Sequence, residues 1–453
     1  MVRVLIPSGA LGLGYDKKAL EKGIASKPDV IAIDGGSTDS GPHYLGTGTS
    51  KYSRTSTKVE WQGLMQARER AGVPLVLGTA GTCGADSSVD WLLDLTREIA
   101  RETGQSVKVA VLKSNQPTDR VVDALVAGDI TALSSAPEIS SELLENCTNI
   151  VALAGAEQIQ AALATGADIV IAGRTTDTAI IAALPLVKGC HAGAAWHGAK
   201  IGECGALCAT NPQSGVILVD FDEEGFTVTP MAENSVATPH TVSAHMLYEN
   251  SDPYILLEPG GHLDVRTATY QALDNKRVRV VGSKWVPSKH YTVKLEAARC
   301  VGFQTILLCL LRDPRYVENV DIWCDDILTK CRAKVQDRLG SDAGEFEIEL
   351  RLIGKSGALG VLETSSSQAS ELGVLGIVTA QSEALANEIA KMLNPYLLHH
   401  PLSKEEEQPT FAFPFSPAEI QRGEIYEFCL NHVMKLQHPM DAFDLTVVDL
   451  GNG

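Results

Sequence analysis

The densest group of chemically useful side chains lies in residues 34–42, DGGSTDSGP, directly after an apolar run. Glycines allow backbone N–H groups to converge on an anion, and hydroxyls add directional donors. Asp34 and Asp39 carry carboxylates that can act as acid, base or metal ligand, and we expect Asp39 to be catalytic. The alternative is a polar turn that caps itself. The expected substrate-binding positions in this loop are Asp34, Ser37, Thr38 and Gly41.

A second loop of the same character, GTAGTCG, occupies residues 78–84 after another apolar run. Cys83 lies in it, and its thiol becomes reactive only beside a positive group, so an inert buried thiol is the preferred interpretation. If the two preceding strands are neighbours, both loops deliver donors to one ligand. The substrate-binding positions expected here and after the apolar run at 107–112 are Thr79, Gly81, Thr82 and Asn115.

A third loop places a guanidinium at the tip of a strand. Arg174 and Asp177 follow the apolar run at residues 169–171. Arginine binds carboxylates through two parallel hydrogen bonds, so Arg174 is expected to hold a substrate carboxylate, with Asp177 beside it. The alternative, compatible with the first, is an ion pair between these two residues in which Asp177 caps the next helix.

Residues 196–208, WHGAKIGECGALC, concentrate further reactive groups. If the segment is helical, spacings of three and four place His197, Lys200 and Cys204 on one face. Such a face could supply a general base, an electrostatic partner and a nucleophile, with Glu203 as a further acid or base. A zinc site built from His191, His197, Cys204 and Cys208 is an alternative, although its spacing fits no standard ligand pattern.

Known nucleotide and nucleophile motifs are missing. The glycines of residues 8–14 follow GxxGxG rather than the dinucleotide pattern GxGxxG, which favours a tight structural turn there. The chain has no GxxxxGK[ST] phosphate loop and no GxSxG elbow. Redox, ATP-dependent and serine-hydrolase chemistry are therefore disfavoured. No cofactor is predicted, and a divalent metal is kept only as an alternative.

The elements that must position these loops alternate between apolar runs and helical periodicity, which is typical of βαβ units. Strands are expected at residues 2–6, 30–33, 75–77, 107–112, 150–152 and 169–171. Helices are expected at residues 17–25, 57–71, 88–103, 118–127, 156–165 and 176–184. Connections in such a fold are right-handed, so the loops after the strands should line one pocket at a single edge of a parallel sheet.

The residue pattern changes near residue 191, first to Gly/Ala-rich loops and then to the alternation typical of strands. The predicted class is α/β: an N-terminal parallel sheet with flanking helices in Rossmann-like layers, followed by an α+β second domain, with a split βαβ sheet as one expected arrangement. The expected divisions are a parallel α/β domain at 1–190, an α+β domain at 191–400 and a C-terminal extension at 401–453 that packs on the core.

Composition excludes several classes of protein. The 453 residues carry 38 Lys and Arg against 56 Asp and Glu, a formal net charge of −18, which disfavours binding to nucleic acid or an anionic membrane. Apolar runs fall far short of the ~18 residues of a membrane span. The chain opens on a strand pattern and its ten cysteines form no CxxC pair, so we expect a cytoplasmic protein with reduced thiols.

Several segments resemble the acyclic terpene utilisation protein AtuA family, formerly a domain of unknown function. They are residues 34–42, 166–177 (GADIVIAGRTTD), 195–205 (AWHGAKIGECG), 237–249 (ATPHTVSAHMLYE), 291–296 (YTVKLE) and 415–428 (FSPAEIQRGEIYEF). The resemblance implies a setting in carboxylate or acyl-CoA catabolism but no particular reaction. It also implies a ferredoxin-like module after the main domain in longer members, for which the tail of this chain is short.

Two classes of function follow. The first is an enzyme that acts on a small polar carboxylate or its CoA thioester by proton abstraction next to a carbonyl, as a hydratase, lyase or isomerase, with a hydrolase as the alternative within enzymes. The second is a ligand-binding subunit whose catalytic partner is a separate chain. The apolar segment at residues 189–208 further predicts a homo-oligomer, most simply a two-fold dimer.

Overall fold

The computed structural model describes residues 1–365 and 369–451. It divides into a main unit, Met1–Arg299 with Phe428–Gly453, and an inserted unit, Cys300–Glu427. The expected boundaries at residues 190 and 400 differ from this division, because strands on both sides of each boundary join the same sheet. Within the described ranges, no helix has the length and apolar character needed to cross a bilayer.

The main unit is built on a ten-stranded sheet whose centre is parallel. The parallel strands, in spatial order, are β1 (Val2–Ile6), β2 (Val30–Asp34), β3 (Leu75–Gly78), β7 (Ile169–Ala172) and β4 (Val107–Lys113). Antiparallel strands extend both edges: β8 (Ile217–Phe221), β9 (Gly225–Pro230), β13 (Val278–Val281) and β12 (Thr269–Ala272) beyond β1, and β20 (Asp444–Leu450) beyond β4. The predicted parallel α/β layer is confirmed, and the sequence reasoning missed β20.

Helices cover both faces of this sheet, which explains why β2, β3 and β7 are buried along their whole length. One face packs on α1 (Lys17–Ala25), α3 (Arg54–Ala71) and α4 (Asp86–Thr103), the other on α7 (Ala156–Ala164), α8 (Ala179–Val187) and α9 (Ala192–Gly202). Alternate residues of each strand point to opposite faces, so Leu5 joins the first layer and Val4 the second. Gly104 ends α4 in the left-handed conformation.

One predicted parallel strand belongs elsewhere. Residues 150–152 lie in β6 (Cys147–Ala152), which pairs antiparallel with β15 (Tyr291–Leu311) instead of joining the parallel sheet. A short apolar run has the same pattern in either setting, so the sequence could not assign its partner. The remaining elements of the main unit are α2 (His43–Thr47), α5 (Thr118–Ala127), β5 (Ile130–Ala132), α6 (Ser141–Glu145), α10 (Pro239–Ala244), β10 (Ile255–Glu258), β11 (Gly261–Asp264), β14 (Lys284–Pro287) and β19 (His432–Leu436).

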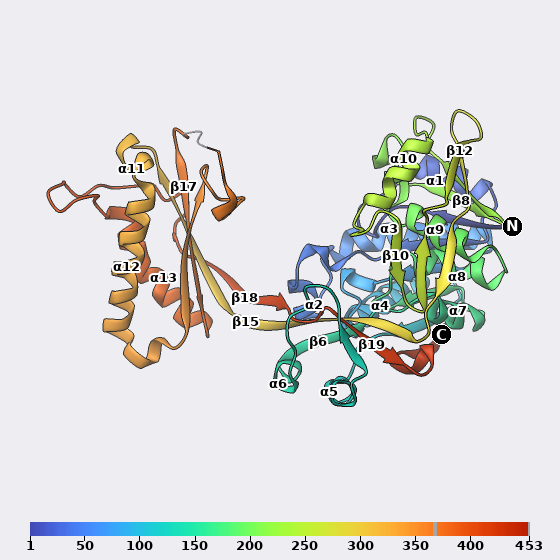
Figure 1. Cartoon of the computed structure of the whole chain (residues 1–453), viewed down its shortest axis with the longest axis horizontal. Coiled ribbons are helices and arrows are strands. Elements are labelled where there is room, and N and C mark those ends of the chain that lie inside the picture. The colour runs from blue at the N-terminus through green and yellow to red at the C-terminus, as the bar shows by residue number, and fades with distance from the viewer. Residues whose placement is uncertain (366–368, 452–453) are drawn as a thin grey trace. The chain divides into compact units, whose positions relative to one another are not determined.

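The inserted unit has the order β-α-β-β-α-β, the split βαβ arrangement that the sequence suggested for the second domain. After the second half of β15 come α11 (Pro314–Glu318), α12 (Val320–Leu339), β16 (Phe346–Ile353), β17 (Leu372–Ala380), α13 (Glu383–His399) and β18 (Ile420–Phe428). β17 lies between β15 and β16, and α12 and α13 pack side by side against this sheet (Figure 1). Trp323 and Leu393 anchor the core between the helices and the sheet.

Candidate functional site

The loops that follow β2, β3 and β7 are joined at the carboxyl edge of the sheet. The backbone N–H of Gly35 donates to Gly78 O at 2.7 Å, and that of Thr79 donates to Gly173 O at 2.8 Å. These strands are direct neighbours, so their loops converge as expected for parallel strands. The close approach requires glycine at Gly84, where φ is +67° and a Cβ atom would lie 2.2 Å from Arg174 N.

Arg174 lies buried at this edge, and its guanidinium forms an ion pair with a carboxylate of the same chain. Its Nε donates to Glu296 Oε2 at 3.0 Å and its Nη2 to Glu296 Oε1 at 3.4 Å. Burial alone raises the pKa of Glu296, but the charges of Arg174 and Lys294 hold it at about 2. The expected partners were a substrate carboxylate or Asp177. The ion pair with Asp177 also forms but is longer, with Oδ1 4.0 Å from Nη1. Asp177 does not cap α8, which begins after Thr178.

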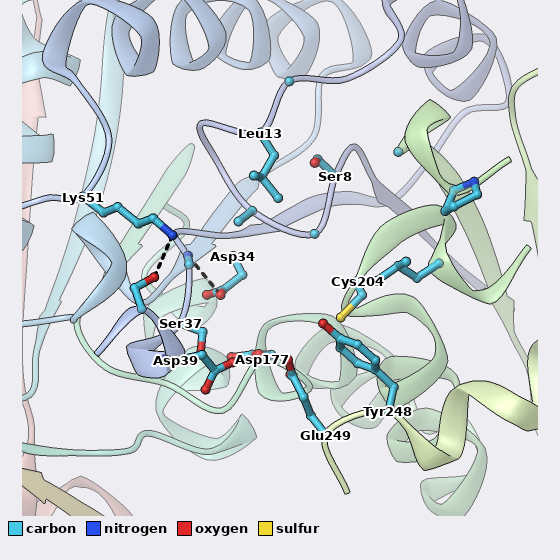
Figure 2. Close-up of a pocket in the computed structure, with 18 of the residues that line it drawn as sticks. Ser8, Leu13, Asp34, Ser37, Asp39, Lys51, Asp177, Cys204, Tyr248 and Glu249 are labelled. Atoms are coloured by element: carbon cyan, nitrogen blue, oxygen red, sulfur yellow. Dashed lines mark hydrogen bonds between the residues drawn. The ribbon is translucent and has the colours of Figure 1, made fainter. Parts of the chain in front are cut away.

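A cavity of about 610 Å³ opens beside these loops. Figure 2 shows the carboxylates of Asp34, Asp39, Asp177 and Glu249 on one side of it and Leu13 on the other. The other lining residues are Ser8, Gly9, Ala10, Gly14, Gly36, Ser37, Ser40, Lys51, Tyr52, Cys204, Leu207, Pro212, Gln213, Gly215 and Tyr248. The volume suits a small organic ligand.

Asp34 and Asp177 form an acidic pair in this lining. Asp34 is 4% exposed, its Oδ2 accepts from Gly36 N at 3.0 Å, and its Oδ1 has no hydrogen-bond partner among the described residues. Burial, followed by the negative charge of Asp177, raises the pKa of Asp34 well above its usual range. Burial also raises the pKa of Asp177, against the opposing charges of Arg174 and Lys200. Ionisation of Asp177 therefore disfavours ionisation of Asp34.

Charge at the cavity is otherwise uneven. Lys51 is the one cationic side chain among the described lining residues, and its Nζ donates to Ser40 Oγ at 2.8 Å (Figure 2). Glu249 adopts φ +51°, an uncommon conformation for a residue with a side chain. Burial, with Asp39 contributing, raises the pKa of Glu249. The cavity is therefore predominantly acidic, with a single ammonium group.

The residues between 197 and 204 that were predicted to share one face do not form a single site in the structure. The helix forms as α9, but it ends at Gly202, so Cys204 lies beyond it. His197 is buried, with Nδ1 2.7 Å from Ser283 Oγ and Nε2 3.2 Å from Tyr270 Oη, and burial lowers its pKa to about 3. Lys200 pairs with Glu203. Of these four residues only Cys204 lines the cavity.

The other predicted binding residues hold the loops rather than face the cavity. Thr38 and Thr79 both accept hydrogen bonds from Arg174, at 3.4 and 3.3 Å. Thr82 packs its methyl group against Gly36, and Asn115 bonds to Asp86 N at 3.0 Å and Asn149 Oδ1 at 3.2 Å. The remaining predicted residues, Gly41 and Gly81, adopt positive φ angles and do not line the cavity. Cys83 is buried, and burial raises its pKa, which agrees with an inert thiol.

Sequence reasoning missed several lining residues. The turn at Ser8 was assigned a structural role only, yet it borders the cavity. Lys51 and Tyr52 carry no local motif, while Tyr248 and Glu249 end one of the segments quoted for the family resemblance. No single stretch of sequence indicated that these residues meet.

The side chains able to hold a metal also differ from the set considered. His191 caps α9 through Nδ1, His197 bonds to Ser283, and Cys208 donates to Gly205 O. Among the described residues, the group with suitable geometry is instead Glu203, Cys204 and His245. The ten cysteines, all within the described residues, form no disulfide.

The apolar segment that suggested a dimer is occupied within the chain. α9 is buried from Gly193 to Gly202, and Trp196 stacks on Trp285 with ring centroids 4.9 Å apart. The stretch from Gly193 to Gly202 is therefore not available to a second copy, whereas Leu207, farther along the predicted segment, is 44% exposed.

Comparison with known proteins identifies the family of the chain. The model of the acyclic terpene utilisation family protein AtuA matches residues 82–416. The match includes Arg174, Asp177, Cys204 and the segment that ends at Glu249. No curated protein and no solved structure matches the chain. Because the family model covers well over half of the sequence, the chain belongs to the AtuA family.

Proposed function

We propose that the protein is an enzyme that binds a small polar carboxylate or its CoA thioester in the cavity and moves a proton next to a carbonyl, as a hydratase, lyase or isomerase. The observation that carries the proposal is the buried carboxyl of Asp34. Its Oδ1 has no hydrogen-bond partner among the described residues, and burial raises its pKa, which favours the protonated form that a proton donor beside the cavity needs.

In the acid–base step the carboxyls of Asp34 and Asp177 have different roles. The ionised carboxylate of Asp177 takes a proton from the carbon next to the substrate carbonyl, and protonated Asp34 gives its proton to the carbonyl oxygen. The product is an enol. Asp34 then takes back the enol proton, and Asp177 gives its proton either to a hydroxyl group on the neighbouring carbon, which leaves as water, or to the far carbon of a conjugated double bond, which yields the isomer. Shared protonation of paired carboxyls makes one an acid and the other a base.

Lys51 takes over the binding role that the sequence assigned to Arg174. The guanidinium of Arg174 is already paired with Glu296, whereas the ammonium of Lys51 lies at the cavity lining. The surrounding carboxylates repel further negative charge, so a ligand with one anionic group suits the cavity better than a di- or tricarboxylate. A CoA ester would place only its acyl part inside.

The test separates binding from catalysis. A thermal-shift screen with small hydroxy and unsaturated monocarboxylates identifies a ligand, since a ligand at ~100 times Kd adds about 2.7 kcal/mol of stability. NMR in deuterated water then follows exchange of the proton next to the carbonyl. We expect exchange in the wild type, and a fall of about 10² or more in Asp34→Asn with binding retained.

The control is Asp90→Asn. Asp90 lies on α4, away from the cavity, and pairs with Lys113. This variant should exchange at the wild-type rate. Binding without any exchange in the wild type would instead favour a non-catalytic ligand-binding subunit, and release of the free acid from a thioester would favour a hydrolase.

A further inference from the structure

Glu203, Cys204 and His245 form a compact group of sulfur, nitrogen and oxygen donors. One ligand atom from each residue lies within 4.8 Å of the other two. Glu203 and Cys204 follow the end of α9, and His245 begins the turn after α10. We propose that these three side chains bind one divalent transition-metal ion of zinc type. The proposal stands apart from the acid–base chemistry assigned to Asp34.

The imidazole of His245 is an independent indication of a ligand. It is 5% exposed, and its Nε2 is buried with no hydrogen-bond partner in the described part of the chain. An unsatisfied buried polar atom destabilises the fold unless something binds it.

The donor set suits zinc more than magnesium or calcium, which prefer oxygen ligands alone. Bonds of about 2.0–2.3 Å in a tetrahedral site place ligand atoms roughly 3.5 Å apart, so the group would contract by about 1 Å on binding. Three protein ligands leave a fourth position open, as in catalytic zinc sites. Because Cys204 also lines the cavity, a cavity ligand can reach the metal from that side.

Lys200 holds the neighbours of this group in place. Its Nζ pairs with Glu203 through Oε1. Lys200 Nζ also donates to Tyr248 O at 2.9 Å, which fixes the loop after His245 beside α9.

The experiment uses Co²⁺ as a spectroscopic probe on the full chain after treatment with a chelator. We expect one Co²⁺ per chain, with an absorption band from thiolate-to-cobalt charge transfer that Zn²⁺ abolishes by competition. Cys204→Ser should lose the band, and His245→Gln should weaken Co²⁺ binding by about tenfold or more. Retained secondary structure by circular dichroism shows that each variant is folded.

Matched controls lie close by. Cys208→Ser alters another buried thiol in the turn after Cys204, and His240→Gln alters an exposed histidine on α10. Both should keep the band and the affinity. A wild type without the band, a band that survives in Cys204→Ser, or equal loss in Cys208→Ser would each overturn the proposal.

Discussion

The carboxylate of Glu296 on β15 binds the guanidinium of Arg174 at the tip of β7, with Nε and Oε2 3.0 Å apart. Both side chains are 8% exposed. This ion pair joins residues 122 positions apart in the chain, and Thr38 Oγ1 donates to the same Oε2 at 3.3 Å. The pair thus fixes the loops after β2 and β7 to β15, beside the cavity.

Removing one charge of this pair should be costly. Glu296→Gln leaves Arg174 buried without a counter-charge, and we expect a loss of about 3 kcal/mol or more in the free energy of unfolding, measured by urea titration. The control is Asp313→Asn, because the Asp313–Arg315 pair is largely exposed and should matter little. An equal effect of both substitutions would contradict the role assigned to the buried pair.

The same pair predicts that the free energy of unfolding depends on pH in the acidic range. The pKa of Glu296 is about 2 in the fold, below the ordinary value of 4.5, so its contribution to stability is present above about pH 4.5 and is lost as the pH falls toward 2. The difference in unfolding free energy between wild type and Glu296→Gln should therefore narrow over that range. A constant difference would show that the carboxylate charge is not what stabilises the fold.

Glu258 should behave in the opposite way. Burial, with the charge of Asp177, raises its pKa to about 7 from 4.5, so its favourable contribution exists below about pH 4.5 and is lost as the pH rises through 7. Glu258→Gln should be nearly neutral near pH 4.5 and stabilising by on the order of 3 kcal/mol above pH 7. Urea titrations across this range test the prediction, with exposed Glu223→Gln expected to have little effect at any pH.

Lys51 offers a direct test of ligand binding. Lys51→Ala should raise the Kd of a carboxylate ligand by about tenfold or more, because one charge-assisted hydrogen bond is lost, while Lys51→Arg should retain most of the affinity. Calorimetric titration gives the values. Lys58→Ala removes an ammonium paired with Glu98 and Glu102 on the helix surface and should leave the Kd unchanged. Loss of affinity in Lys58→Ala would point to a general effect of net charge.

Two glycines with nearly the same backbone conformation allow the cost of backbone strain to be distinguished from the cost of steric overlap. Gly84 has φ +67° and Gly104 has φ +70°, but only at Gly84 does a Cβ atom meet backbone, 2.2 Å from Arg174 N. Gly104→Ala should cost about 1 kcal/mol from conformation alone. Gly84→Ala should cost several kcal/mol more by thermal or urea unfolding, since the loops after β3 and β7 must move apart. Equal costs would mean that these loops yield easily.

The sequence predicted the layers of the main unit well and the site only in part. Apolar runs such as Leu75–Gly78 identify buried strands, and the convergence of their loops follows from parallel topology. Pairing between distant segments leaves no local signal, so neither the antiparallel partner of β6 nor the counter-ion of Arg174 was predictable. The prediction for Arg174 was chemically reasonable, but Glu296 supplies the carboxylate that was expected from a substrate.

The division of the chain has a consequence for how such a gene could change. The N–H of Cys429 donates to Ala297 O at 3.0 Å, so the polypeptide leaves the main unit and returns to it at nearly the same place. A recombination event that replaced residues 300–427 with a tight hairpin turn would leave the strands of the main unit connected in their present register. The inserted unit could thus be lost, exchanged or gained in one step while the main unit was inherited intact.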